Sequence, residues 1–130
     1  DRDQSRGLGD VYKRQVYARS RLVHAGASVG VDVIDVPYLD LENMDGMKRE
    51  AQFVKDLGFT GKGSIHPKQI NILNEIFTPS PEEIIKAKRI VNQFNEANTG
   101  LVVIDGKLIE KPVLREMQRK ILVADKISKN

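Results

Sequence analysis

The sequence contains no cysteine and no tryptophan, and only 5% of its residues are aromatic. Without cysteine, disulfides, thiolate metal ligands and cysteine nucleophiles are excluded, which suits a reducing cytosol. Aliphatic side chains must therefore fill the core. No apolar run approaches the roughly 20 residues that a membrane-spanning helix needs, and no signal peptide is recognisable at the start. We expect a cytoplasmic protein with no membrane partner.

The charge of the chain is nearly balanced. Its 130 residues include 21 basic and 18 acidic side chains, which gives a net charge of +3. Basic and acidic residues alternate along the expected helices, as is typical of solvated helix faces, so we expect no nucleic-acid partner. A hydrophobic content of 40% suits one modest domain or part of a larger one.

The first fifteen residues, DRDQSRGLGDVYKRQ, are polar and aperiodic. Their GLGDVYKRQ segment resembles a translated sequencing adapter. We therefore interpret residues 1–15 as a leader that does not belong to the native protein, and a native but disordered tail is the alternative.

Residues 16–78 alternate between helical and strand patterns. A helix is expected up to Gly30, a strand at VDVIDVPY, a helix that ends at Gly58, a strand at GKGSI and a helix that begins at Pro67. Strands separated by one helix pair in parallel through right-handed crossovers. This predicts an α/β fold. Two strands cannot bury both faces of such a sheet, so we interpret the segment as the last part of a larger domain.

Residues 79–130 predict a helix, a β-hairpin and a second helix. Ser80 is the expected N-cap of the first helix, with Pro81 in its first position and Glu83 completing a capping box. Two short apolar runs are joined by Asp105-Gly106, a strong hairpin signal. We interpret these residues as a small appended module.

Acidic residues gather after the first expected strand, where parallel sheets present functional groups. They are Asp35, Asp40, Glu42 and Asp45. We favour helix capping by Asp40 or Asn43 over a binding role for this group, but the binding role stays open. Asp35 stands apart because it lies inside an apolar strand and needs a partner if it is buried.

His66 lies where the second strand passes into a helix, directly before Pro67. The segment is either a turn that needs a proline or the rim of a binding site, where helix amides with Lys62 or Lys68 meet a phosphate. The spacing supports both interpretations equally. His24, the other histidine, is expected to be a surface or packing residue.

Several segments resemble, in order, the citrate lyase beta subunit family of the HpcH/HpaI aldolase/citrate lyase superfamily. They are ARSRLV, IDVPYLD, DGMKREAQFVKDLGFTGKGSIHPKQI, IFTPSPEEI and DGKLIEKP, and the resemblance runs from about Tyr17 to Leu122. It implies that residues 16–78 are the C-terminal part of a TIM (β/α)8 barrel, with its last two strands, DVIDV and GKGSI. Residues 79–130 would be a C-terminal helix–hairpin–helix extension that packs on a neighbouring subunit, often in a homotrimer.

The resemblance also implies a reaction. A citryl thioester, carried on coenzyme A or on an acyl carrier protein, would be cleaved to oxaloacetate and an acetyl thioester with the help of Mg²⁺. The Mg²⁺ ligands would belong to earlier barrel strands, so no metal ligand is assigned here, and the 130 residues alone are expected to be inactive. The alternatives are a malyl-CoA or citramalyl-CoA lyase, and an assembly piece without catalysis. Other citrate lyase subunits are further expected partners.

The resemblance assigns site residues at two places. Segments that line the entrance for coenzyme A are matched by Ile65, His66 and Pro67, and by Asp35, Pro37 and Tyr38. Glu110 occupies the position of an aspartate that moves a proton at the acetyl methyl carbon in the neighbouring subunit's site. Its spacing alone favours helix-terminus electrostatics. A glutamate is one methylene longer, and catalysis tolerates a misplacement of about 1 Å poorly.

Overall fold

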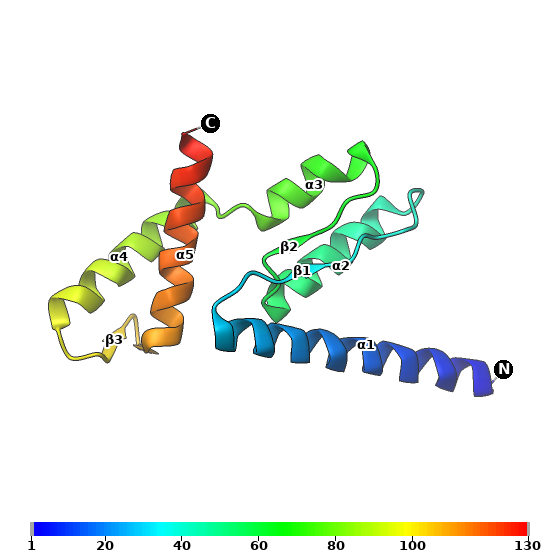
Figure 1. The fold of residues 1–130 in the computed structure, drawn as a ribbon, viewed down its shortest axis with the longest axis horizontal. Coiled ribbons are helices and arrows are strands. Elements are labelled where there is room, and N and C mark those ends of the chain that lie inside the picture. Colours follow the sequence, from blue (N-terminus) through cyan, green and yellow to red (C-terminus); the bar gives the residue numbers. More distant parts are fainter. Residues whose placement is uncertain (1, 130) are drawn as a thin grey trace. The chain divides into compact units, whose positions relative to one another are not determined.

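The structure is a computed structural model that describes the backbone of residues 2–129 and the side chains of residues 13–129. It divides after Phe77 into two compact units. In the described part, no helix is both long and apolar enough to cross a membrane. The elements, labelled in Figure 1, are α1 (Arg2–Val29), β1 (Ile34–Asp35), α2 (Met44–Leu57), β2 (Gly61–Lys62), α3 (Pro67–Phe77), α4 (Pro81–Ala97), β3 (Val102–Ile104), β4 (Lys107–Ile109) and α5 (Lys111–Ser128).

The first unit contains α1 to α3 with a two-stranded parallel sheet, which confirms the α/β class. Ile34 pairs with Gly61 and Asp35 pairs with Lys62. Both strands are shorter than expected, with two residues each. On one side, the backbone N–H of Val33 donates to the Thr60 side chain instead of to a backbone carbonyl. On the other side, Pro37 has no N–H to continue the ladder.

Helix α1 begins earlier than the sequence predicts. The backbone of residues 2–15 is helical and continues into residues 16–29. A disordered leader is therefore not what the structure shows. Once the later turns of a helix are fixed by packing, each further residue adds a hydrogen bond without a new nucleation cost, and this segment contains no proline to interrupt it. The non-native origin of residues 1–15 stays a prediction.

Helices α2 and α3 supply the core of the first unit. Gly58 ends α2 in the left-handed conformation (φ 113°), as the sequence predicts, and its N–H donates back to Lys55 and Val54. The buried cluster consists of Met47, Ala51, Leu73 and Ile76, with Tyr38, Met44, Ile72 and Phe77 packed against it. This core lies next to the loop that follows β1, because Tyr38 belongs to that loop.

The second unit confirms the predicted helix, hairpin and helix. Ser80 Oγ accepts from the Glu83 N–H at 3.2 Å, and the Ser80 N–H donates to Glu83 at 3.4 Å, which completes the capping box. Asp105 (φ 53°) and Gly106 (φ 74°) form the turn of the antiparallel hairpin. Figure 1 shows α4 and α5 side by side with the hairpin near one end. The core consists of Ile90, Ile104 and Ile109, with Phe94, Val102, Val113 and Met117 around it.

Gly26 provides a test of how α1 packs on the segment that leads into β1. Alanine in a helix interior is normally about 1 kcal/mol more favourable than glycine. A Cβ on Gly26 would, however, overlap the Cγ2 methyl of Val33. We expect Gly26→Ala to lower the midpoint of thermal unfolding, because overpacking costs about 1–3 kcal/mol and outweighs the helix gain.

Gly61→Ala is the matched control, because its Cβ would lie 3.7 Å from Ile34 Cγ1, an ordinary contact. Thermal unfolding followed by circular dichroism compares the two variants. A Gly26→Ala protein at least as stable as the wild type would contradict this packing.

Candidate functional site

A buried ion pair joins the two strands at the point where they pair. Asp35 of β1 stands opposite Lys62 of β2 in the register of the sheet. Lys62 Nζ lies 2.6 Å from Asp35 Oδ2, and the two side chains are 0% and 4% exposed. The expectation that a buried Asp35 needs a partner is confirmed.

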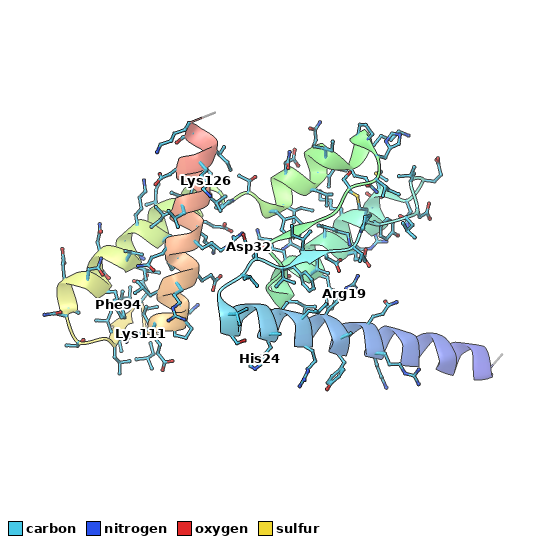
Figure 2. All side chains as sticks on the ribbon, viewed as in Figure 1. Arg19, His24, Asp32, Phe94, Lys111 and Lys126 are labelled. Atoms are coloured by element: carbon cyan, nitrogen blue, oxygen red, sulfur yellow. The ribbon has the colours of Figure 1, made fainter. Side chains whose placement is uncertain are left out.

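Arg19 of α1 and Glu50 of α2 extend this pair into an ion-pair network of four residues. Arg19 Nε lies 3.1 Å from Asp35 Oδ1, and its Nη2 lies 3.1 Å from Glu50 Oε1. Glu50 Oε2 lies 2.9 Å from Lys62 Nζ, which closes the ring. Two cations alternate with two carboxylates, so the formal charges cancel. Figure 2 shows Arg19 and His24 on opposite sides of α1, with Arg19 on the side of the strands.

The electrostatics of Arg19 follow from this network. Desolvation of its guanidinium lowers the pKa, but the hydrogen bond to Glu50 and the charge of Asp35 outweigh that effect. The net result is a pKa of Arg19 above its ordinary value. Arg19 therefore stays a cation in the partly buried space between α1 and the strands.

The side chain of Lys62 is buried between the strands and the helices, and does not reach the surface at the end of β2, where a ligand would bind. Its ammonium group is fully buried and is bound to Asp35, to Glu50 and to the Val36 carbonyl oxygen at 2.8 Å. Those three partners take the three donors of an ammonium group. The interpretation that Lys62 meets a phosphate is therefore wrong. Asp35 is likewise occupied, since both of its carboxylate oxygens accept from Arg19 or Lys62.

The loop after β1 packs closely against the loop after β2. A Cβ on Gly63 would lie 3.0 Å from Pro37 Cγ and 3.1 Å from Pro37 Cδ, so only glycine permits this approach without a shift. Asn43 caps α2 by accepting from the Gly46 N–H at 2.9 Å, which confirms the capping interpretation for Asn43. Its Nδ2 donates to the Tyr38 hydroxyl at 3.3 Å.

The loop after β2 carries Ile65 and His66 at the start of α3. Ile65 is 50% exposed, and His66 is half-buried. The Lys68 N–H donates to His66 Nδ1 at 3.1 Å, so the imidazole caps the helix. Because Nδ1 accepts, the proton of the neutral ring belongs on Nε2, which can donate to a ligand. The structural and the binding interpretation of His66 are therefore compatible.

Gln69 joins the two loops and was missed by the sequence reasoning. Its side chain is fully buried, and Nε2 donates to the Tyr38 carbonyl oxygen at 2.8 Å. Its Oε1 accepts from the Ile65 N–H at 2.9 Å and from Ser64 Oγ at 3.2 Å. One signal was present in the sequence: Gln69 precedes the buried Leu73 by one helical turn and so stands on the apolar face of α3.

Glu110 belongs to the second unit. It is the N-cap residue of α5, but its exposed side chain makes no capping hydrogen bond, and its backbone oxygen accepts from the Leu114 N–H. The carboxylate therefore contributes no hydrogen bond to the helix start. The predicted entrance residues Asp35, Pro37, Tyr38, Ile65, His66 and Pro67 all lie at the strand ends of the first unit.

The side chains of residues 13–129 do not include a group of three or more His, Asp or Glu residues placed to hold a metal ion. Asp35, which is buried, and Glu50, which is partly buried, are both paired with Arg19 and Lys62. A carboxylate already neutralised by two cations is a poor donor for Mg²⁺. The donor set of this part of the chain does not fit a Mg²⁺ site.

Comparison with known proteins identifies relatives of the chain. A model of the HpcH/HpaI aldolase/citrate lyase family matches residues 2–67. The chain is 35% identical over 115 residues to the mitochondrial citramalyl-CoA lyase of Rattus norvegicus, covering 86% of this chain and 34% of the relative. It is 31% identical over 113 residues to the citrate lyase subunit beta of Leuconostoc mesenteroides subsp. cremoris, covering 85% and 37%.

A solved structure shares the fold. The crystal structure of CitE from Mycobacterium tuberculosis, in complex with magnesium, acetoacetate and coenzyme A, matches with a TM-score of 0.66 at 26% identity. The match covers 84% of this chain and 40% of that one. The chain spans about a third of the length of the curated relatives described above.

The ion-pair network predicts a large difference between two Asp→Asn substitutions. Asp35→Asn leaves Lys62 buried with one carboxylate fewer, and removing one partner of a buried pair costs about 3 kcal/mol or more. We expect a clear fall in the midpoint of urea unfolding.

Asp105→Asn is the matched control, because Asp105 also pairs with an arginine, Arg89, but both side chains are about half exposed. Asparagine tolerates the positive φ of this position, so its unfolding midpoint should stay close to that of the wild type. Equal midpoints for the two variants would contradict a stabilising network.

Proposed function

Because the chain belongs to the HpcH/HpaI aldolase/citrate lyase family, we propose that it is part of a carbon–carbon lyase that acts on an acyl thioester. The proposed substrate is a citryl thioester of coenzyme A or of an acyl carrier protein, and the products are oxaloacetate and an acetyl thioester. The similarity to citrate lyase subunit beta supports this choice. A citramalyl or malyl thioester is the second candidate, favoured by the 35% identity to citramalyl-CoA lyase.

In the proposed whole protein, β1 and β2 are the last two strands of a TIM barrel. Their parallel pairing supports this placement, as do the exposed apolar side chains of β1 and its surroundings, Ile34 (69%) and Val36 (65%). Such side chains are normally covered when both faces of a parallel sheet are packed. The helix–hairpin–helix of the second unit is proposed to pack on a neighbouring subunit of a homotrimer, with other citrate lyase subunits as further partners.

The exposed corner formed by Ile65 and His66 is the observation that carries the proposal. It lies at the carboxyl end of a parallel strand, where such sheets bind ligands. We assign Ile65, His66 and Pro67, with Pro37 and Tyr38 opposite, to the entrance for the coenzyme A or pantetheine arm. His66 Nε2–H supplies a hydrogen-bond donor, and Ile65 supplies an apolar contact. Asp35 acts indirectly, by holding Lys62 and the strand ends.

Glu110 is proposed to move the proton at the reacting carbon. Cleavage transfers the electrons of the carbon–carbon bond to the acetyl thioester, which leaves as an enolate. A protonated Glu110 gives its proton to the methylene carbon and becomes a carboxylate. The substrate hydroxyl group loses its proton to solvent as it becomes the keto group of oxaloacetate, and solvent then returns a proton to Glu110. The Glu110 side chain is exposed and makes no capping hydrogen bond, which supports this role. The Mg²⁺ that would stabilise the enolate is assigned to ligands outside the described side chains.

Replacing Glu110 tests the catalytic assignment. Glu110→Gln keeps the shape of the side chain but cannot exchange the proton, so kcat of the full-length protein should fall by about 10²–10⁴-fold. Glu116→Gln is the control, an acid on the same helix that pairs only weakly with Lys120 at 3.8 Å, and it should leave kcat unchanged. Turnover of citryl, citramalyl and malyl thioesters is measured with Mg²⁺. If Glu110→Gln turns over at the wild-type rate, Glu110 is not the catalytic acid. If the wild type turns over none of the three thioesters, the proposed function is wrong.

The two histidines test the entrance. His66→Ala should raise the dissociation constant for coenzyme A several-fold, because the donor at the rim is lost. His24→Ala should not, since His24 is exposed on the side of α1 that faces away from the strands (Figure 2). Titration calorimetry of the full-length variants with coenzyme A measures both values. Equal affinities for the two variants would exclude His66 from the entrance.

A further inference from the structure

The Gln69 side chain makes hydrogen bonds to both loops of the candidate entrance. Its amide nitrogen donates to the Tyr38 carbonyl oxygen, and its amide oxygen accepts from the Ile65 N–H and the Ser64 hydroxyl. Tyr38 lies 31 residues before Gln69 in the sequence, whereas Ile65 and Ser64 lie four and five residues before it. Gln69 thus connects two segments that are distant in sequence.

The burial of Gln69 shows that this connection is more than a surface contact. The side chain is 0% exposed, as are those of Met47 and Val54 in the surrounding core. A buried amide without partners costs several kcal/mol, so a glutamine is kept in such a place only when its bonds are made. An apolar residue of similar size would fill the same space. It would leave the Tyr38 oxygen and the Ile65 N–H without their partner.

The position of the bonds matters for the entrance. Both backbone partners, the Tyr38 carbonyl and the Ile65 N–H, belong to residues assigned to the entrance, and neither residue lies in a strand. The strands end at Asp35 and Lys62, and the next bonds between the two segments, from the Gly63 N–H to the Asp35 oxygen and from Lys62 Nζ to the Val36 oxygen, do not reach Tyr38 or Ile65. The His66 side chain is fixed by the Lys68 N–H, which donates to its Nδ1. Gln69 supplies the missing connection from this turn to Tyr38.

We infer that Gln69 is a positioning residue for the thioester arm: it fixes the spacing between the Tyr38 loop and the Ile65–His66 turn, and with it the width of the entrance. This inference rests on the proposed function, because the ligand is the coenzyme A arm assigned there. Gln69 does not touch the ligand. It acts through the backbone of Tyr38 and Ile65.

The experiment compares Gln69→Leu with Leu73→Ala in the full-length protein. Leu73 is buried one turn further along α3, so its truncation weakens the same core without touching the loop bonds. Amide hydrogen exchange is measured at Ile65, and coenzyme A affinity is measured by calorimetry. In Gln69→Leu, exchange at Ile65 should rise about tenfold or more relative to both wild type and Leu73→Ala, because its hydrogen-bond acceptor is gone. Coenzyme A should bind about tenfold more weakly.

A second variant covers the case in which Gln69→Leu does not fold. Gln69→Glu, compared with wild type at alkaline pH where the carboxyl group is ionised, keeps an oxygen that accepts from the Ile65 N–H but has no donor for the Tyr38 oxygen. Exchange at Ile65 should then stay close to the wild-type rate, while the carbonyl carbon shift of Tyr38 changes and coenzyme A affinity falls. An unchanged Tyr38 shift in this variant would overturn the inference.

The outcomes separate the inference from the proposed function. If wild type binds coenzyme A, and Gln69→Leu binds it as well as Leu73→Ala does, the positioning role is wrong and the function stands. If wild type neither binds coenzyme A nor turns over any of the three thioesters, the proposed function fails. Amide hydrogen exchange alone then tests whether Gln69 connects the two loops. Faster exchange of the Ile65 amide in Gln69→Leu supports the connection, and an unchanged exchange rate overturns it.

Discussion

The neutral ring of Arg19, Asp35, Glu50 and Lys62 is the interaction on which the first unit depends. Each side chain comes from a different element, namely α1, β1, α2 and β2. Removing an ion from water costs several kcal/mol, and only the full alternation of signs offsets that cost for all four. A packing that separated β1 from β2 would part Asp35 from Lys62, the two most deeply buried charges of the four. The ring therefore selects one arrangement, although the two strands share only two residue pairs.

The local features of the fold could be predicted because local residues determine them. Gly58 ends α2, Ser80 and Glu83 form the capping box, and Asp105-Gly106 forms the hairpin turn, each through bonds within a few residues. The parallel pairing followed from the order of elements. The strand lengths were overestimated because β-branched residues favour an extended chain, but they do not supply the partner that a ladder needs.

The site was only partly predictable. The need of Asp35 for a partner could be derived from its apolar surroundings, but Arg19 and Lys62 are 16 and 27 residues away, and no local pattern identifies them. Lys62 was one of two lysines, with Lys68, that could meet a phosphate in one of the two interpretations, because the sequence shows the charge of a side chain and not its burial. Gln69 was overlooked for the opposite reason. A polar residue on an apolar helix face has a meaning only when its partners in the two loops are known.

The four-membered ring also constrains how this protein can change over evolutionary time. A single neutral substitution at residues 19, 35, 50 or 62 turns a balanced set into an unbalanced one, so most one-step routes pass through a less stable ancestor. Viable lineages should instead replace opposite charges as pairs, or exchange the whole ring for apolar side chains. Among distant descendants, the identities at these four positions should therefore vary together and not independently.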